Sequence, residues 1–257
     1  MYDRATVIPS PISAKAMDAA AGRKVRSLRI TRVFPISDFR GASLGLQEDA
    51  MPHRYAEIAF TPTVKKAQEQ FGSRNAYARM EGAPETRNHL LGQAEAQFIA
   101  ARNSFYMATV SETGWPYIQH RGGPTGFVRV LDDSTIGFAD FRGNRQYISL
   151  GNLANDDRVS LFFMDYPNKT RLKLFGRAKV VGLDDDATLS LLETPDYRAR
   201  VERGFLIRVE GFDWNCPQHI TERYTLDEVR AMTAPLTARI AELEQQLAQA
   251  AGAATSI

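Results

Sequence analysis

Cationic side chains recur where predicted strands of this sequence run into predicted loops. A guanidinium or ammonium group in such a place can bind a phosphate or carboxylate through charge-assisted hydrogen bonds. Residues 143–146 join a predicted strand to a predicted helix. Their free backbone amides and Arg145 can therefore bind a phosphate at the helix N-terminus. The alternatives are an ordinary turn for this run and solvated strand ends for the cations. The residues concerned are Arg121, Arg129, Arg142, Arg145, Arg171 and Lys173.

Several other chemistries have no support in the sequence. It contains no Walker loop, no His-Glu-x-x-His helix and no Gly-x-Gly-x-x-Gly dinucleotide loop. The one cysteine, Cys216, has no neighbouring base in the sequence and is expected to be structural. Catalytic residues therefore stay unassigned. No metal site is expected, because the four histidines have no paired spacing; they are His53, His89, His120 and His219.

Around residue 104 the apolar pattern changes from helical spacing to alternation along short segments. Such segments separated by turns about every 8–12 residues predict an antiparallel barrel or sandwich with peripheral helices, a mainly β, α+β fold. The predicted strands are residues 105–110, 115–120, 126–131, 135–138, 159–164, 172–181 and 204–211. The predicted helices are residues 62–70, 92–101, 143–155, 187–192 and 226–250, the fourth of them capped by Asp184, Asp185 and Asp186.

Composition narrows the classes of partner. The 257 residues carry a formal net charge of +2, with 44% hydrophobic and 24% charged residues, which is typical of a globular protein. This near-neutral balance does not favour nucleic acid as a partner. No apolar run approaches the roughly 20 residues of a membrane-spanning helix, so no membrane segment is expected. A single cysteine gives no sign of an oxidising compartment, and a cytoplasmic location is the expectation.

Three regions are predicted along the chain. Residues 1–50 carry eight basic and five acidic residues with no sustained apolar period, and we expect a loosely ordered arm. Its basic stretch, residues 23–32, has a second interpretation as a docking segment for a polyanion or a partner subunit. Residues 51–225 form the folded domain, and residues 226–257 form a C-terminal helix and tail. In that helix an apolar seam of less than two heptads packs onto the body or onto a partner subunit; it comprises Leu236, Ile240, Leu243 and Leu247.

Four stretches within residues 90–215 resemble the FMN-binding split barrel of the pyridoxamine 5′-phosphate oxidase superfamily. They read Gly126-Phe-Val-Arg-Val-Leu, Thr135-Ile-Gly-Phe-Ala-Asp-Phe-Arg-Gly-Asn-Arg-Gln146, Asn155-Asp-Asp-Arg-Val-Ser-Leu-Phe-Phe163 and Arg171-Leu-Lys-Leu-Phe-Gly-Arg-Ala-Lys-Val180. The resemblance implies an antiparallel split β-barrel with peripheral helices. It also implies FMN as cofactor and a homodimer with the flavin in the subunit interface.

The resemblance assigns cofactor-binding residues position by position. In the family a Gly-Ser-Arg-Lys loop holds the FMN phosphate. Asn144 and Arg145 align with the two cationic positions of that loop. Asn144 departs from the family pattern, and the resemblance implies that this substitution weakens one of the contacts to the phosphate. Arg171 replaces a glutamine at the isoalloxazine edge, where a cation would stabilise reduced FMN; its alternative is a solvent-facing side chain. The remaining assigned contacts are Gln119, Arg121, Arg129, Phe138, Ala139 and Trp214.

The end of the barrel differs from that of the oxidase proper. Residues 212–219 read Phe-Asp-Trp-Asn-Cys-Pro-Gln-His, which is similar to the uncharacterised flavin-nucleotide-binding branch, and the oxidase's arginine-histidine pair has no clear equivalent. The resemblance therefore implies an FMN-dependent oxidoreductase acting on a small substrate or on NAD(P)H. The alternatives are a non-catalytic flavin-binding or storage protein and the same barrel holding deazaflavin or haem.

Overall fold

A computed structural model describes residues 53–81, 88–214 and 218–254. The chain divides into two units, Met1–Gln47 and Glu48–Ile257, and all described residues belong to the second. The predicted arm therefore lies outside the described residues. The helices are α1 (Arg54–Ala59), α2 (Pro62–Gln70), α3 (Arg74–Glu81), α4 (Gln93–Ala100), α5 (Ile148–Asn155), α6 (Asp186–Leu192) and α7 (Leu226–Ala254). The strands are β1 (Ser104–Val110), β2 (Pro116–Gly122), β3 (Val128–Val130), β4 (Thr135–Phe141), β5 (Arg158–Asp165), β6 (Thr170–Val181) and β7 (Val201–Trp214).

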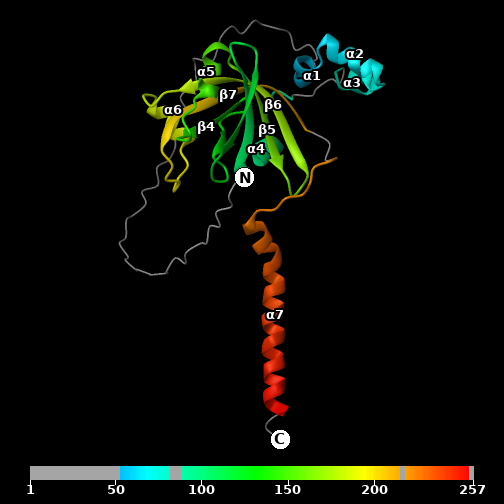
Figure 1. The fold of residues 1–257 in the computed structure, drawn as a ribbon, viewed down its shortest axis with the longest axis vertical. Coiled ribbons are helices and arrows are strands. Elements are labelled where there is room, and N and C mark those ends of the chain that lie inside the picture. The colour runs from blue at the N-terminus through cyan, green and yellow to red at the C-terminus, as the bar shows by residue number, and fades with distance from the viewer. Residues whose placement is uncertain (1–52, 82–87, 215–217, 255–257) are drawn as a thin grey trace, which may run out of the picture. The chain divides into compact units, whose positions relative to one another are not determined.

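The strands form one curled antiparallel sheet in the order β2-β1-β5-β6-β7-β4-β3 (Figure 1). Consecutive strands pair as hairpins where the connection is short, as between β1 and β2 and between β5 and β6. The β1–β2 turn ends at Gly114, whose φ of +84° suits a residue without a Cβ atom. This sheet, with its surrounding helices and the C-terminal helix, confirms the predicted α+β split barrel.

Aromatic and aliphatic side chains from the inner face of the sheet fill the core. In β1 alternate residues point inward, and Phe105 stacks on Phe163 of β5 with ring centroids 4.9 Å apart. Phe138 of β4 stacks on Phe205 of β7 at 5.2 Å. Burying such side chains contributes about 1.5–3 kcal/mol each, so this cluster is the main support of the sheet.

Strand β4 is buried on both faces, unlike the alternating β1. Its outer face is covered by α6, and a Cβ atom at Gly137 would lie only 2.6 Å from a methyl carbon of Leu192. The cap of α6 is the predicted acidic run, with the Asp185 carboxylate accepting from the Thr188 amide. Helix α6 thereby packs on the outer face of β4, and the inner face of β4 points into the barrel.

The predicted helix 62–70 is confirmed without a shift, and helix 92–101 within one residue at each end. Helix 143–155 is wrong at its start, because residues 143–147 form a loop and α5 begins at Ile148. Strand 204–211 is longer at both ends, as β7 runs from Val201 to Trp214. Helices α1 and α3 were not predicted. Within the described residues no helix is long and apolar enough to cross a membrane.

Candidate functional site

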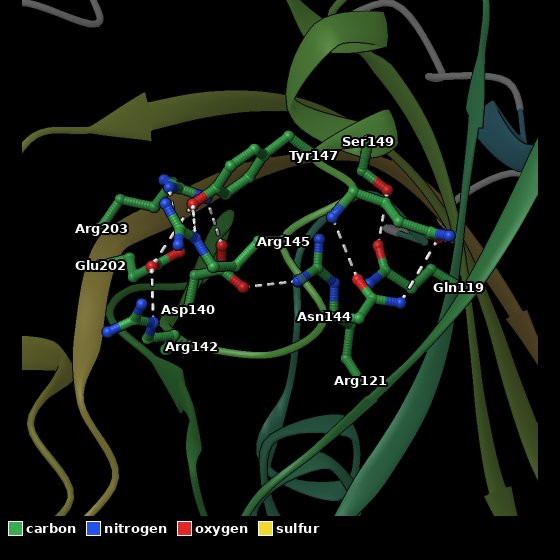
Figure 2. Close-up of polar contacts among 11 residues, drawn as sticks. Gln119, Arg121, Asp140, Arg142, Asn144, Arg145, Tyr147, Ser149, Glu202 and Arg203 are labelled. Carbon is green, nitrogen blue, oxygen red and sulfur yellow. Dashed lines mark hydrogen bonds and ion pairs between the residues drawn. The ribbon is translucent and has the colours of Figure 1, made fainter.

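A cavity of about 170 Å³ lies where β2, β4, β7 and the loop before α5 meet. Its lining is mainly polar and includes both acidic and basic side chains (Figure 2). The residues that line it and enter the argument below are Tyr117, Gln119, Arg121, Asp140, Asn144, Arg145, Tyr147, Ser149, Glu202 and Arg203.

Strand β2 supplies one wall of the cavity. Side chains two residues apart in a strand share a face, and the inward face of β2 carries Tyr117, Gln119 and Arg121. The Gln119 carboxamide oxygen accepts a hydrogen bond of 2.9 Å from the hydroxyl of Ser149 in the first turn of α5. This bond ties the edge strand of the sheet to the helix across the cavity.

Asp140 lies between two guanidinium groups at the inner end of β4. Arg121 Nη1 donates to Asp140 Oδ1 at 2.5 Å, and Arg203 Nη1 donates to Oδ2 at 2.9 Å (Figure 2). The backbones of Asp140 and Arg203 are direct cross-strand partners in β4 and β7, which sets the second contact. Burial raises the pKa of Asp140, and the two arginines oppose that rise. Burial likewise lowers the pKa of Arg121, opposed by Asp140.

Arg121 retains one hydrogen-bond donor without a partner. Its Nε atom is buried and has no acceptor among the described residues. The guanidinium lies over the floor of the cavity, with Cζ 5.3 Å from the ring centroid of Phe205 and 5.9 Å from that of Phe138. A buried donor left unpaired costs about 1–3 kcal/mol, so a ligand acceptor that reached it would be favoured.

The loop before α5 is strained, and the helix that follows it starts without a side-chain cap. Arg145 and Tyr147 both adopt left-handed φ values, 61° and 56°, which cost a non-glycine residue about 1–2 kcal/mol each. Tyr147 is the N-cap of α5 and makes no side-chain capping bond. The first amides of a helix have no intrahelical acceptor and carry the positive end of its dipole. This uncapped end, beside Arg145, is suited to an anion.

Glu202 of β7 connects the loop to the arginine pair. Its carboxylate accepts from the Tyr147 hydroxyl at 3.4 Å and from Arg203 Nη2 at 3.3 Å, and it forms an ion pair of 3.8 Å with Arg142. Tyr147 in turn accepts a hydrogen bond of 3.0 Å from Arg145 Nε, and this bond raises the pKa of Arg145. Arg145 and Tyr147 are thereby linked to Glu202 at the exposed side of the cavity.

The structure brings part of the predicted cofactor set together. Gln119, Arg121, Asn144 and Arg145 line the cavity, and Phe138 lies beneath Arg121. Ala139 is buried in β4 opposite Gly204. The other three predicted contacts lie away from this lining: Arg129 donates to the Glu193 carbonyl, Arg171 lies over Phe162, and Trp214 packs on Phe98 and donates to Glu95. Their contact with a flavin stays a prediction.

Sequence reasoning missed six of the ten cavity residues named above, and Tyr117 of β2 is one of them. Asp140 stood in a quoted stretch, one residue after Ala139, but a lone aspartate after a strand carries no specific signal. Glu202 and Arg203 reach the site only through the register of β7 against β4. Tyr147 and Ser149 belong to a segment predicted as helix, in which their side chains had no assigned role.

A second cavity, about 430 Å³, lies between α1 and strands β1, β5 and β6. It is larger but mostly apolar. Its three arginines already have carboxylate partners: Arg54 pairs with Glu57 and Glu210, Arg158 with Asp156, and Arg177 with Asp157 and Glu210. Because its cations are paired and lie at a mainly apolar surface, the first cavity is the better candidate for an anionic ligand. No cluster of metal-ligating side chains occurs among the described residues.

Comparison with known proteins finds one family model and several similar solved structures. Residues 91–203 match the family model described as pyridoxamine 5′-phosphate oxidase. Similar solved structures include a putative pyridoxamine 5′-phosphate oxidase from Lactobacillus delbrueckii (22% identity, 50% of this chain and 97% of that one, TM-score 0.39). HupZ of Group A Streptococcus is 19% identical over 52% of this chain and 100% of that one, with a TM-score of 0.40. An FMN-binding protein from Syntrophomonas wolfei is 13% identical over 60% and 97%, with a TM-score of 0.36.

The search of curated proteins gave no match. The family match spans β1 to β6 and extends into the start of β7, so it includes every lining residue of the first cavity except Phe205. Over residues 91–203 this chain is therefore similar to the family described as pyridoxamine 5′-phosphate oxidase.

Proposed function

We propose that the first cavity binds the phosphate end of FMN and that the chain is an FMN-dependent oxidoreductase acting on a small molecule or a nicotinamide nucleotide. The observation that carries the proposal is the buried, unpartnered Nε of Arg121, which lines the same cavity as the uncapped N-terminus of α5. Both groups are donors that lack an acceptor, and a phosphate ester offers acceptor oxygens with negative charge.

The charge of the lining fits a phosphate. Arg121, Arg145 and Arg203 contribute three positive charges, and Asp140 and Glu202 contribute two negative ones, so the lining carries 3 − 2 = +1. A phosphate monoester carries about −1.5 to −2 at neutral pH. The phosphate would therefore change the net charge of the site from positive to negative. Arg145 is exposed, and its Nε donates to the Tyr147 hydroxyl and to no carboxylate, so its guanidinium would be available to the phosphate.

The size of the cavity supports an assignment to one end of the cofactor. Pockets that enclose a drug-sized ligand measure about 300–1,000 Å³, and this one measures about 170 Å³. The phosphate and the adjoining chain of FMN would occupy it, and the ring system would extend beyond. In a homodimer, which the family resemblance implies, the second copy would cover the exposed ring.

Bound FMN would supply the two-electron redox chemistry. The residues of this chain hold the phosphate, through Arg145 and the first amides of α5, and keep donors at fixed places along the cavity wall, through Arg121 and Gln119. Ser149 positions Gln119 by donating to its carboxamide oxygen. No side chain of the lining is needed as an acid or base for this role.

A binding experiment tests the cofactor. Titration of the cofactor-free protein with FMN and with riboflavin, followed by flavin fluorescence, is expected to show tighter binding of FMN, because riboflavin lacks the phosphate. Purified protein that is yellow and releases FMN on denaturation would agree. A colourless protein that binds neither flavin in titration would overturn the proposal.

A second experiment separates an enzyme from a flavin-binding or storage protein. Anaerobic mixing of the flavin-loaded protein with NADH or NADPH is expected to bleach the flavin absorbance within seconds. The Arg145→Ala variant, loaded at saturating FMN, serves as the matched control, since weaker phosphate binding alone leaves hydride transfer intact. No bleaching over minutes with either donor would support a storage role or another electron donor.

A further inference from the structure

The N-terminus of helix α7 is capped by nearby side chains. The Thr225 hydroxyl accepts from the Glu228 amide at 3.2 Å, and the Glu228 carboxylate accepts from the Thr225 amide at 2.7 Å. This reciprocal pair is a capping box, which satisfies two amide donors at the helix start. From there α7 runs without interruption to Ala254 (Figure 1).

Apolar residues of α7 follow an unbroken heptad repeat. Steps of three and four residues alternate from the start of the helix, which is the spacing of the a and d positions of a coiled coil. Thr233 is the one polar residue in the series. The a positions are Leu226, Thr233, Ile240 and Leu247, and the d positions are Val229, Leu236, Leu243 and Ala250. The repeat thus spans more than three heptads, about the length that a coiled coil needs. It is longer than the seam of less than two heptads expected from the sequence, because Leu226 and Val229 continue the same register before Thr233.

This apolar stripe is uncovered. Leu236, Ile240 and Leu247 are 66%, 57% and 70% exposed, and the whole helix is exposed in the described part of the chain. A continuous row of exposed aliphatic side chains marks a surface that contacts another molecule. Pro235, which cannot donate to the helix ladder, falls at position c, away from the stripe.

The polar face of α7 argues for a protein partner. Helices that lie on membranes are rich in Lys and Arg on the polar face. Here the charged residues at positions 226–250 are two basic and four acidic; they are Arg230, Arg239, Asp227, Glu228, Glu242 and Glu244. An acidic face of this kind is repelled by an anionic lipid surface.

The charges beside the stripe fit a second copy of the same helix. In a parallel pair the g residue of one helix faces the e residue of the next heptad on the other. Arg239 is at g and Glu244 is at the following e, so two copies place opposite charges together on both sides of the seam. Arg239 also pairs with Glu242 of its own helix, but both side chains are more than half exposed.

The apolar residues at the centre of the seam also favour pairing with a second copy of α7. A β-branched residue at a with leucine at d favours two parallel strands, and the central layers hold Ile240 at a and Leu243 at d. We infer that α7 binds α7 of a second copy of this chain as a parallel two-stranded coiled coil. This surface is separate from the cavity, so it stands whether or not the chain binds FMN.

Disulfide trapping in the full-length protein tests the inference. With Cys216 replaced by serine, Ala250→Cys places one thiol at a d position near the end of the seam. In a parallel pair the two thiols face each other, and mild oxidation is expected to give cross-linked dimer as the main species. Adding Ile240→Asp and Leu243→Asp to this background should reduce the cross-linked fraction to the level of random collision.

An antiparallel pair of α7 helices is detected by cross-linking two different cysteine variants. A mixture of two proteins, one with Thr233→Cys and one with Ala250→Cys, cross-links between unlike partners only when the helices run in opposite directions. That outcome would overturn the parallel assignment. Cross-linking of Ala250→Cys that the two aspartates leave unchanged would overturn the coiled coil itself, as would its absence at all concentrations. Dimerisation through the barrels changes none of these outcomes, because each reports on α7.

Charge reversal supplies the matched control. Glu244→Arg faces Arg239 of the second copy and should weaken helix pairing roughly two- to fivefold, given the modest strength of exposed ion pairs. Glu242→Arg makes the same change of charge at an outward position and is expected to leave cross-linking nearly unchanged. The double variant Arg239→Glu, Glu244→Arg should restore the wild-type level. Failure of restoration would remove this ion pair from the interface.

Discussion

Arg121 and Asp140 join two strands that are not neighbours in the sheet. Arg121 belongs to the edge strand β2, Asp140 belongs to β4, and four other strands separate β2 from β4 in the sheet order. Their ion pair therefore closes the barrel across its split by side chains where backbone pairing is missing. Since both groups line the cavity, the contact that closes the barrel also sets the charge of the site.

Removing the charge of Asp140 should tighten FMN binding. Asp140→Asn changes the lining from +1 to +2 and keeps an oxygen that can accept from Arg121, so the arginine stays in place. We expect FMN affinity at neutral pH to rise a few-fold, with riboflavin affinity unchanged. Fluorescence titration measures both. Asp157→Asn, which removes a carboxylate paired with Arg177 outside this cavity, is the matched control and should alter neither value.

The difference in FMN affinity between the wild type and Asp140→Asn should depend on pH, because the pKa of Asp140 is raised. Burial holds the pKa above the ordinary value of 3.8, so on acidification the wild-type carboxyl becomes neutral at a higher pH than an exposed aspartate would. The wild type and Asp140→Asn should then converge in FMN affinity at a higher pH than protonation of an exposed aspartate would give. Protonation of the FMN phosphate affects both proteins equally and cancels. Affinities that converge only where an exposed aspartate is protonated would contradict the raised pKa.

Arg145 should discriminate FMN from riboflavin. Its guanidinium is exposed at the cavity and hydrogen-bonded to a tyrosine hydroxyl, so it is available to the phosphate. Arg145→Ala is expected to weaken FMN binding about 10- to 100-fold, the range for a hydrogen bond to a charged group, and to leave riboflavin binding nearly unchanged. Arg208→Ala removes an exposed arginine in the middle of β7, outside the cavity lining, and serves as control. Equal losses for both flavins would refute the phosphate role.

Much of the sheet was predictable because its signals are local. Alternation in residues 105–110 and the Glu-Thr-Gly turn fix the first hairpin without any distant information. Helix α1 was not predictable, since six residues show no clear period; a Cβ atom at Gly211 would lie 2.8 Å from the Tyr55 amide, so a close approach of β7 accompanies this helix.

The site was predictable only in part, for a similar reason. Gln119, Arg121 and Arg145 could be named because they stand in or beside recognisable stretches. The partner of Asp140 could not, because Arg203 is brought opposite it by the register of β7 against β4, and these two strands are about 60 residues apart in the sequence. The start of α5 was misplaced because Tyr147, which shares helical spacing with Leu150 and Leu153, adopts a left-handed φ that the spacing does not reveal.

The strain in the loop leads to a prediction about stability. Arg145 has a φ of 61°, which glycine adopts without a steric penalty and alanine does not. Arg145→Gly should therefore melt at a higher temperature than Arg145→Ala, by about 2–4 °C, while both variants lose the phosphate contact. Thermal unfolding of the two cofactor-free variants measures the difference. Equal melting temperatures would show that the loop relaxes once the arginine side chain is gone.

The hydrogen bond from Ser149 to Gln119 should contribute both to folding and to the site. The Ser149 side chain is buried, and its hydroxyl is the donor that links α5 to the edge strand β2. Ser149→Ala is expected to lower the free energy of unfolding by about 1 kcal/mol, the usual net value of a hydrogen bond inside a protein, measured by urea denaturation. Ser190→Ala removes an exposed hydroxyl that donates to a backbone carbonyl within α6 and should cost less than half as much. Because Gln119 loses the group that orients it, the Ser149 variant should also bind FMN and riboflavin more weakly by the same factor, unlike Arg145→Ala. A loss confined to FMN would place Ser149 at the phosphate and not at the wall formed by β2.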